Sequence, residues 1–232
     1  MALRSKSSGM SLPMRVWDGA TRLFHWSLVV LIAVSYLSVT FATGTRADLL
    51  MRIHLASGEA ILALLLFRLA WGVIGSQTAR FSQFLGNPLH AFGHLAKMFR
   101  REPDLQVGHN PAGGWMVVLL LLLLSVQVGT GLFANDDGAT EGPLMHLVGK
   151  AGSDTLSEIH SVSFNLLMVA MAVHVITIVL YAVFKGQNLT RPMITGKKKL
   201  PAATRAPRMA SPLLAGLVFV IAAGIAAAVA LL

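Results

Sequence analysis

Cysteine is absent from the 232-residue chain, and charged residues are scarce, at 12% of the total. Without cysteine, the chain cannot form disulfides, iron–sulfur clusters, thiolate metal sites or haem attached through thioether bonds. Soluble domains carry about 25% charged residues, whereas 55% of the residues here are hydrophobic. The composition therefore predicts a membrane protein, in which the eight histidines are the main candidates for metal or cofactor chemistry.

Five apolar stretches are long enough to cross a bilayer as helices, which takes about 20 residues each. Because only helices and closed barrels satisfy their backbone polar groups in lipid, all five are predicted to be helical. The stretches cover 23–43, 53–74, 114–134, 160–184 and 212–232. The expected fold is therefore an all-α membrane protein, with a four-helix transmembrane bundle over residues 23–184 and a fifth, C-terminal transmembrane helix.

Lysine and arginine divide unevenly between the two sides of this bundle. Fifteen of the nineteen lie in the N-terminal segment 1–22 and in the connections 75–112 and 185–211, whereas connections 43–52 and 135–159 hold three. By the positive-inside rule, the first group is predicted to be cytoplasmic, which places the C-terminus on the opposite side of the membrane. The net charge of +9 then reflects topology and not nucleic-acid binding.

The connections differ in character. Segment 75–112 contains "LHAFGHLAKMFRR", whose apolar residues at helical spacing beside basic ones predict a short interfacial helix on the inner surface. Segment 185–211 is expected to be a basic cytoplasmic linker, with its run "KKK" facing anionic lipid headgroups. The outer connections hold six acidic residues, and that charge would suit a positively charged partner protein: Asp48, Asp136, Asp137, Glu141, Asp154 and Glu158.

Two histidines stand fourteen residues apart in the fourth apolar stretch, "IHSVSFNLLMVAMAVH". On an α-helix this spacing gives about 21 Å of depth and a rotation about 40° short of four turns. His160 and His174 therefore lie on one face, one near the outer surface and one nearer the inner surface. His54 begins the second span on the outer side, and His25 begins the first span on the inner side. The pairs predicted by depth are His54 with His160 and His25 with His174.

Two imidazoles at one depth, without carboxylates or thiolates around them, suit an iron porphyrin with two histidine ligands in a bundle core. Zinc normally takes three or four protein ligands. Arg68, fourteen residues after His54, should lie at the depth of His174. A haem propionate would supply the anion that a buried arginine needs, although the side chain could instead snorkel to the headgroups. Gly58, Gly129 and Gly131 could let a flat macrocycle approach the backbone.

Two further features are open to two interpretations each. In "GHNPAGG", His109 and Asn110 either bind a quinone carbonyl beside the inner haem or simply begin a helix, with Asn110 as its cap. His90 and His94, four residues apart, are either a metal pair or ordinary surface residues, and the second interpretation is preferred.

Four stretches together resemble the bacterial dihaem cytochrome b561 family, over roughly residues 15–185: "VWDGATRLFHWSLV", "RIHLASGEAILALLLFRLAWG", "GHNPAGGWMVVLLLLLLSVQVGTGLF" and "IHSVSFNLLMVAMAVH". That family includes the cytochrome b subunits of nickel–iron hydrogenases. The resemblance implies a four-helix bundle with two b-type haems, the inner one ligated by His25 and His174 and the outer one by His54 and His160. It also implies electron exchange with the quinone pool. The fifth helix departs from the core pattern of the family.

The function expected is electron transfer across the inner membrane by two haem b groups. Electrons would pass between a periplasmic redox partner, a c-type cytochrome or a hydrogenase-like protein, and ubiquinone or menaquinone. One alternative is a superoxide oxidase that reduces ubiquinone without a protein partner. That reaction needs a cationic funnel near the outer haem, for which Arg46, Arg52 and Lys150 are the candidates. The other alternative is a haem-free transporter. Neither the partner, the direction of electron flow nor the oligomeric state follows from the sequence.

Overall fold

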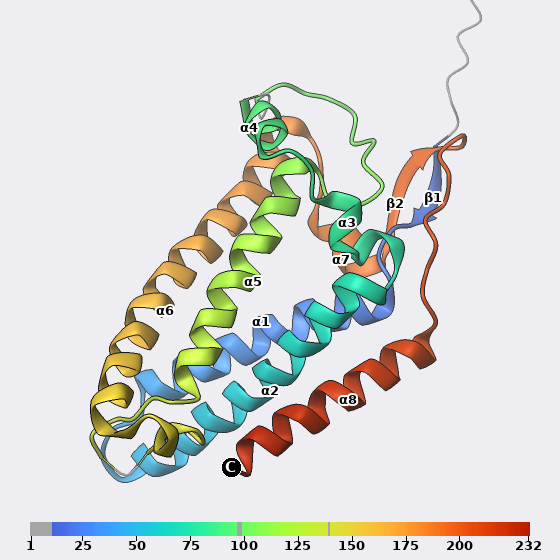
Figure 1. Ribbon diagram of the computed structural model, residues 1–232. Coiled ribbons are helices and arrows are strands. Elements are labelled where there is room, and N and C mark those ends of the chain that lie inside the picture. The colour runs from blue at the N-terminus through green and yellow to red at the C-terminus, as the bar shows by residue number, and fades with distance from the viewer. Residues whose placement is uncertain (1–10, 97–98, 139) are drawn as a thin grey trace, which may run out of the picture.

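The computed structural model describes residues 11–96, 99–138 and 140–232. In this part of the chain, five helices are long and apolar enough to cross a membrane (Figure 1). They are α1 (Gly19–Thr40), α2 (Ala47–Ile74), α5 (Pro111–Gly131), α6 (Gly149–Leu180) and α8 (Pro212–Ala230). The predicted helical membrane fold is confirmed, and the chain is a multi-pass membrane protein.

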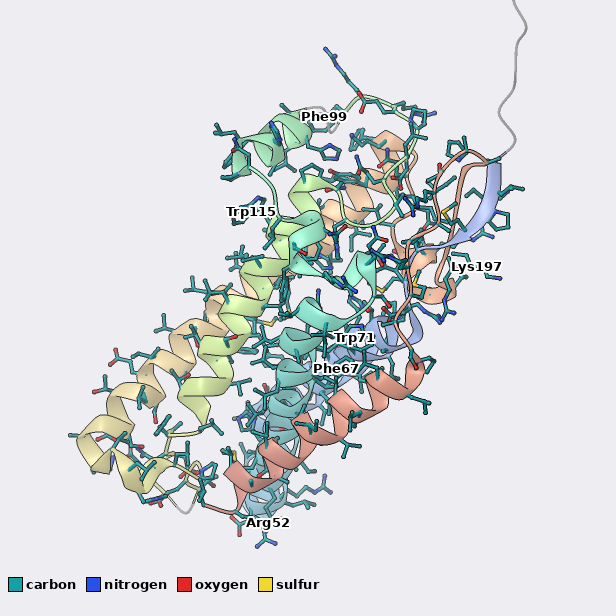
Figure 2. All side chains as sticks on the ribbon, turned by 45° about the vertical axis from the view of Figure 1, so that its right-hand side comes forward. Arg52, Phe67, Trp71, Phe99, Trp115 and Lys197 are labelled. Atoms are coloured by element: carbon teal, nitrogen blue, oxygen red, sulfur yellow. The ribbon has the colours of Figure 1, made fainter. Side chains whose placement is uncertain are left out.

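The helices form two antiparallel hairpins, α1 with α2 and α5 with α6, and α2 also packs against α5 and α8 (Figure 1). One end of the bundle is formed by β1 (Ser11–Arg15) and by the described residues of segments 75–110 and 186–211, and is named the basic end here. The opposite end, formed by segments 41–46 and 132–148, is named the acidic end. Figure 2 shows Arg52 at the acidic end and Phe99 and Lys197 at the basic end.

Four of the five long helices begin earlier than the predicted spans, and the first turns of α1 and α6 are polar. Helix α1 begins at Gly19, where Asp18 acts as N-cap and its Oδ1 accepts a hydrogen bond from Thr21 N at 2.6 Å. Helix α6 begins at Gly149, eleven residues before the predicted start at 160. It continues beyond Leu180 as a π-helical turn, η4 (Tyr181–Lys185), and Gly186 then takes a left-handed φ of 69°.

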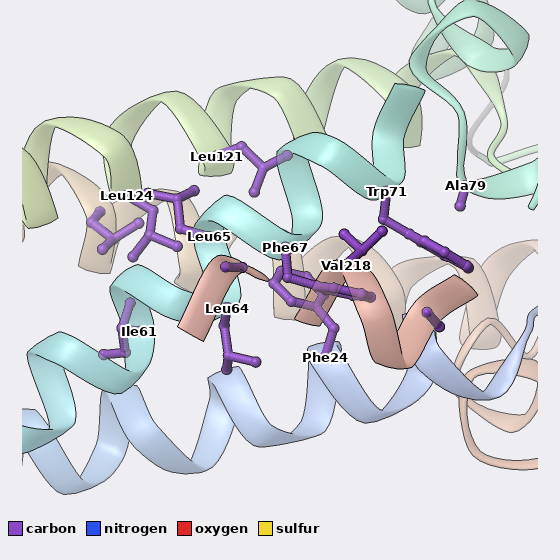
Figure 3. Close-up of a cluster of buried hydrophobic side chains, with 13 residues drawn as sticks. Phe24, Ile61, Leu64, Leu65, Phe67, Trp71, Ala79, Leu121, Leu124 and Val218 are labelled. Carbon is purple, nitrogen blue, oxygen red and sulfur yellow. The ribbon is translucent and has the colours of Figure 1, made fainter. Parts of the chain in front are cut away.

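Helix α2 lies at the centre of the apolar core, because it contacts α1, α5 and α8. Its Ile61, Leu65 and Phe67 are buried together with Leu121 of α5 and Val218 of α8, and Trp71 is 1% exposed (Figure 3). The outer faces of the helices carry many exposed apolar side chains, as expected of surfaces that contact lipid tails. Helix α8 thus adds a packing partner for α2 outside the two hairpins.

The basic end contains a small antiparallel sheet of β1 (Ser11–Arg15) and β2 (Lys197–Pro201), in which Ser11 pairs with Pro201. It covers the buried residues Val16, Trp17 and Leu200. Sequence patterns did not predict these strands, because the two segments are far apart in the chain and β2 is mostly lysine. The segment predicted as a linker, 185–211, therefore has regular structure, including α7 (Thr190–Thr195). Residues 1–10 of the predicted N-terminal segment lie outside the described residues.

The remaining elements are short and lie in the connections: η1 (Gly44–Arg46), η2 (Gln77–Ala79), α3 (Phe81–Phe84), α4 (Pro88–Ala96) and η3 (Met145–Leu147). Helix α4 lies where a short helix was expected in the second connection. Its Leu89 and Phe92 are exposed. Its position on the membrane surface stays a prediction, and residues 97–98 of the predicted segment lie outside the described residues.

Candidate functional site

The structure brings His54 of α2 and His160 of α6 together at the acidic end of the bundle. Their ring centroids are 6.3 Å apart and the ring planes are almost perpendicular, at 89°. Two metal–imidazole bonds of about 2.0 Å each, together with the radii of the two rings, give a spacing of about 6 Å. The two rings therefore have the separation of ligands that bind one metal ion from opposite sides.

Both histidines line a cavity of about 410 Å³, which is within the range of about 300–1,000 Å³ typical of small-molecule sites. Its wall is largely apolar, with Ile61, Leu124 and Leu167 among the lining residues. At the acidic end the lining includes Asp136 and Thr140, so the cavity extends to the connection between α5 and α6. This is a shape suited to a mostly apolar molecule with one polar edge.

Hydrogen-bond contacts at Nδ1 fix the orientation of each of the two imidazole rings. The Nδ1 atom of His54 lies 3.1 Å from the Ser35 carbonyl oxygen and 3.0 Å from its hydroxyl. The Nδ1 atom of His160 lies 2.9 Å from the Gln127 carbonyl oxygen. A backbone carbonyl only accepts hydrogen bonds, so Nδ1 carries the proton in both rings and Nε2 is left to bind a metal.

The Gln127 side chain occupies part of this space. Its Nε2 lies 2.9 Å from Nε2 of His160, and its Oε1 accepts a hydrogen bond of 2.5 Å from the Ser163 hydroxyl. A metal at Nε2 of His160 requires this amide to rotate away. Gln127 and Ser163 were not identified from the sequence, although an amide inside an otherwise apolar helix is a recognisable signal.

Glycines allow the His160 ring to lie close to α5. A Cβ atom at Gly131 would stand 2.8 Å from Cε1 of His160, so any larger residue there displaces the ring. Gly58 also lines the cavity, and a Cβ atom built on it meets no described atom within 4 Å. Gly129 has similar open space but is not among the lining residues. Two of the three predicted glycines therefore border the cavity.

At the basic end, His25 of α1 and His174 of α6 are close enough for their charges to interact. Nδ1 of His25 is buried and has no hydrogen-bond partner among the described residues. The Trp26 ring lies edge-on to the His25 ring at 4.9 Å. Helix α6 and its π-helical turn extend eleven residues past His174 to Lys185, and this overhang lets His174 reach the level of His25.

Arg68 is buried close to this second pair. The side chain is 3% exposed, its guanidinium carbon lies 4.9 Å above the Phe81 ring, and Nη1 has no hydrogen bond within the part of the chain that is described. The Asp18 carboxylate acts on it electrostatically, but is itself bonded to Thr21 and to Nε1 of Trp71. The alternative that Arg68 snorkels to the surface is wrong for this structure.

His109 and Asn110 lie beside the same region. The His109 ring packs between Trp17 and Phe84, at centroid distances of 4.7 and 4.6 Å, and its Nδ1 is buried. Burial lowers the pKa of His109 to about 3, and the charges of Arg68 and His174 add to the effect. The imidazole is therefore neutral near pH 7.

Asn110 is the N-cap of α5. Its Oδ1 accepts a hydrogen bond from Gly113 N at 2.7 Å, and Pro111 is the first residue of the helix. The capping interpretation is therefore confirmed. The cap uses Oδ1 and leaves the Nδ2 donor for another contact.

The model for prokaryotic cytochrome b561 matches residues 16–196, which include both histidine pairs. Two curated proteins are similar to the chain, each named a probable Ni/Fe-hydrogenase B-type cytochrome subunit. The one from Bradyrhizobium diazoefficiens is 25% identical over 79% of this chain and 85% of its own length. The one from Rhizobium leguminosarum bv. viciae is 24% identical over 79% of this chain and 87% of its own. No solved structure matches the chain.

The match covers most of the chain and all four of its long hairpin helices. The matched segment also contains every histidine that the structure brings into a pair. The protein therefore belongs to the prokaryotic cytochrome b561 family, and is an electron-transferring b-type cytochrome of the membrane.

Proposed function

We propose that the protein binds two haem b groups and conducts electrons between them across the inner membrane. His54 and His160 would hold one haem, and His25 and His174 the other. The observation that carries the proposal is the facing pair of rings, 6.3 Å apart across a cavity of about 410 Å³. The proximity of His25 to His174, and Gly131, which lets the His160 ring lie against α5, support it.

Haem b supplies one-electron chemistry when it is bound. The chain's own residues hold and orient it. Ser35 and the Gln127 carbonyl fix the ligand tautomers at the acidic end. Because each histidine pair would supply two imidazoles to one haem iron, no position would be left for oxygen, which favours electron transfer over oxygen chemistry. Arg68 is buried, and its Nη1 has no hydrogen bond among the residues described, which supports the proposal that it binds a propionate of the second haem.

The redox partner is proposed to dock at the acidic end, on the periplasmic side. Asp136, Asp137 and Glu141 are exposed there, next to the cavity. This charge suits a positively charged surface on a c-type cytochrome or a hydrogenase-like protein. The two similar proteins are named as hydrogenase subunits, which supports a hydrogenase-like protein as the partner.

The quinone, ubiquinone or menaquinone, is proposed to bind at the basic end near His109 and Asn110. Both residues lie beside the second histidine pair, at the start of α5. The N–H of a neutral His109 can donate one hydrogen bond to a quinone carbonyl oxygen.

The superoxide alternative is weakened by the charges at the acidic end. Lys150, one of its three candidate cations, forms ion pairs with both Asp137 and Asp154. Its charge is therefore compensated, and it contributes little to a funnel for an anion.

One experiment separates these functions. Purified protein in lipid nanodiscs is reduced with dithionite and mixed with decylubiquinone, and oxidised protein is mixed with superoxide in a stopped-flow instrument. We expect quinone to reoxidise the haems in a saturable way and superoxide to reduce them slowly. Fast reduction by superoxide would favour the enzyme, and a colourless protein would remove both functions in favour of a transporter.

The Gly131→Ala variant is expected to lose or weaken the haem of the acidic-end pair, because its methyl group displaces the His160 ring. Gly129→Ala is a matched control on the same helix, since its methyl group meets no described atom within 4 Å. The control should keep parental haem content and gain up to about 1 kcal/mol from helix propensity. The reduced-minus-oxidised spectrum measures the haem content of both variants. Equal haem content in Gly131→Ala and Gly129→Ala would contradict the role of Gly131.

A further inference from the structure

Two polar side chains are buried without a hydrogen bond where α6 ends. Tyr181 is 1% exposed and Lys185 is 3% exposed. Neither the Tyr181 hydroxyl nor Nζ of Lys185 has a hydrogen-bond partner in residues 11–96, 99–138 and 140–232. Burial of unsatisfied donors is costly, and in native proteins it commonly marks a site for another molecule. The sequence pattern counted Lys185 with the basic linker, and its burial is a correction.

These two residues continue the line of the haem-ligand candidates along α6. Tyr181 follows His174 by seven residues, which on an α-helix is about 10 Å of rise and about 20° short of two turns. Lys185 is one further turn on, and its Nζ lies 5.4 Å from the centre of the Tyr181 ring. The turn that carries them, η4, is π-helical. Such turns are rare and frequently found at functional sites.

The charges nearby select the kind of ligand. Oε2 of Glu102 lies 3.7 Å from Nζ of Lys185, so the ammonium is already paired with a carboxylate. Asp104 acts electrostatically on Tyr181 from the same segment. Asp104 is itself paired with Lys198, at 2.5 Å, so the two carboxylates and the two lysines compensate one another and leave no net positive charge to attract a phosphate. A neutral acceptor, such as a carbonyl oxygen, needs no net charge and can accept from both donors.

Neighbouring groups suit a flat ring with carbonyls. The His94 ring of α4 stacks against Tyr181 at a centroid distance of 6.1 Å. The Asn110 side chain lies beside the Tyr181 hydroxyl without meeting the geometry of a hydrogen bond. Lys185 and Asn110 thus both lie next to Tyr181, where α6 ends and α5 begins.

We propose that Tyr181 and Lys185 bind a carbonyl oxygen of the quinone headgroup at the basic end. The inference rests on the proposed exchange with quinone. It adds the donors that hold the headgroup, and these lie about two to three turns after His174 on α6 and η4. It extends the site expected at His109 and Asn110 to the end of α6.

Photolabelling with an azido-ubiquinone tests the site on the haem-loaded full chain in phosphatidylcholine nanodiscs. Labelled peptides are mapped by mass spectrometry, and decylubiquinone competes for the label. We expect the label in segments 102–110 and 181–187. The half-saturating decylubiquinone concentration should rise about threefold to tenfold in Tyr181→Phe and about tenfold or more in Lys185→Met. Lys185→Arg, which keeps the donors, should stay closer to the parent.

Lys199→Met is the matched control, because it removes one exposed positive charge at the same end, on β2. It should leave the half-saturating concentration unchanged. Parental affinity in both Tyr181→Phe and Lys185→Met, with label mapped elsewhere, would overturn the inference. So would loss of labelling when phosphatidylglycerol is added, if Lys185→Met abolishes that competition, because the donors would then bind a lipid phosphate.

Haem quantitation on the same samples keeps the two proposals apart. Two haems per chain with saturable labelling at another place contradicts only the site at Tyr181 and Lys185. A parent without haem contradicts the proposed function itself.

Discussion

The His54→Ala and His160→Ala variants should each bind one haem per chain where the parent binds two, and both should lose the same haem. The two rings lie on either side of one cavity, and a haem that loses one axial ligand loses half of its attachment to the protein. His25→Ala and His174→Ala should each lose the other haem, the one at the basic end. Reduced-minus-oxidised spectra with haem quantitation measure all four.

His146→Ala provides the control for these variants. His146 is an exposed histidine of η3 at the acidic end, and its removal should leave both haems in place. A common phenotype for His25→Ala and His160→Ala would show that the rings pair differently. Loss of both haems in every variant would show that the bundle, and not a particular site, had failed.

The Arg68→Gln variant should lower the midpoint potential of the haem of the basic-end pair. A nearby positive charge favours the reduced, less positive haem, so its removal favours the oxidised form. The potential shifts by the difference between the Arg68 interaction free energies in the two redox states, and a difference of about 1.4 kcal/mol corresponds to about 60 mV for one electron. Spectroscopically monitored redox titration resolves the two haems, and the acidic-end haem should hold its potential.

Arg52→Gln is the matched control for this measurement, because Arg52 is exposed on the same helix near the acidic end (Figure 2). It should leave the basic-end haem unchanged. A parental potential for that haem in Arg68→Gln would contradict the contact with a propionate. Arg68→Lys keeps the positive charge, so its basic-end haem should have a midpoint potential between those of the parent and Arg68→Gln.

The arrangement of the helices and the pairing of the rings could be predicted because the signals are local. Apolar length marks each span. The fourteen-residue spacing of His160 and His174 fixes both depth and face on any α-helix. The Asn110 cap is a short-range signal of the same kind.

Features that depend on contacts distant in the sequence could not be predicted. Nothing in the "KKK" run indicates a strand, because β2 forms only when β1 pairs with it. The burial of Lys185 depends on Glu102 and the packing of the basic end. Position in the sequence alone placed Lys185 in the basic linker. The Gln127 amide could have been noticed as a polar group in an apolar helix, but its contact with His160 could not.

The most direct measurement of the central claim is the haem content of the purified full chain, expressed with haem freely available. The account predicts two haem b per polypeptide, each with the sharp reduced spectrum of an iron bound by two histidines. A protein with one haem would contradict one of the two pairs, and a protein without haem would contradict the account as a whole.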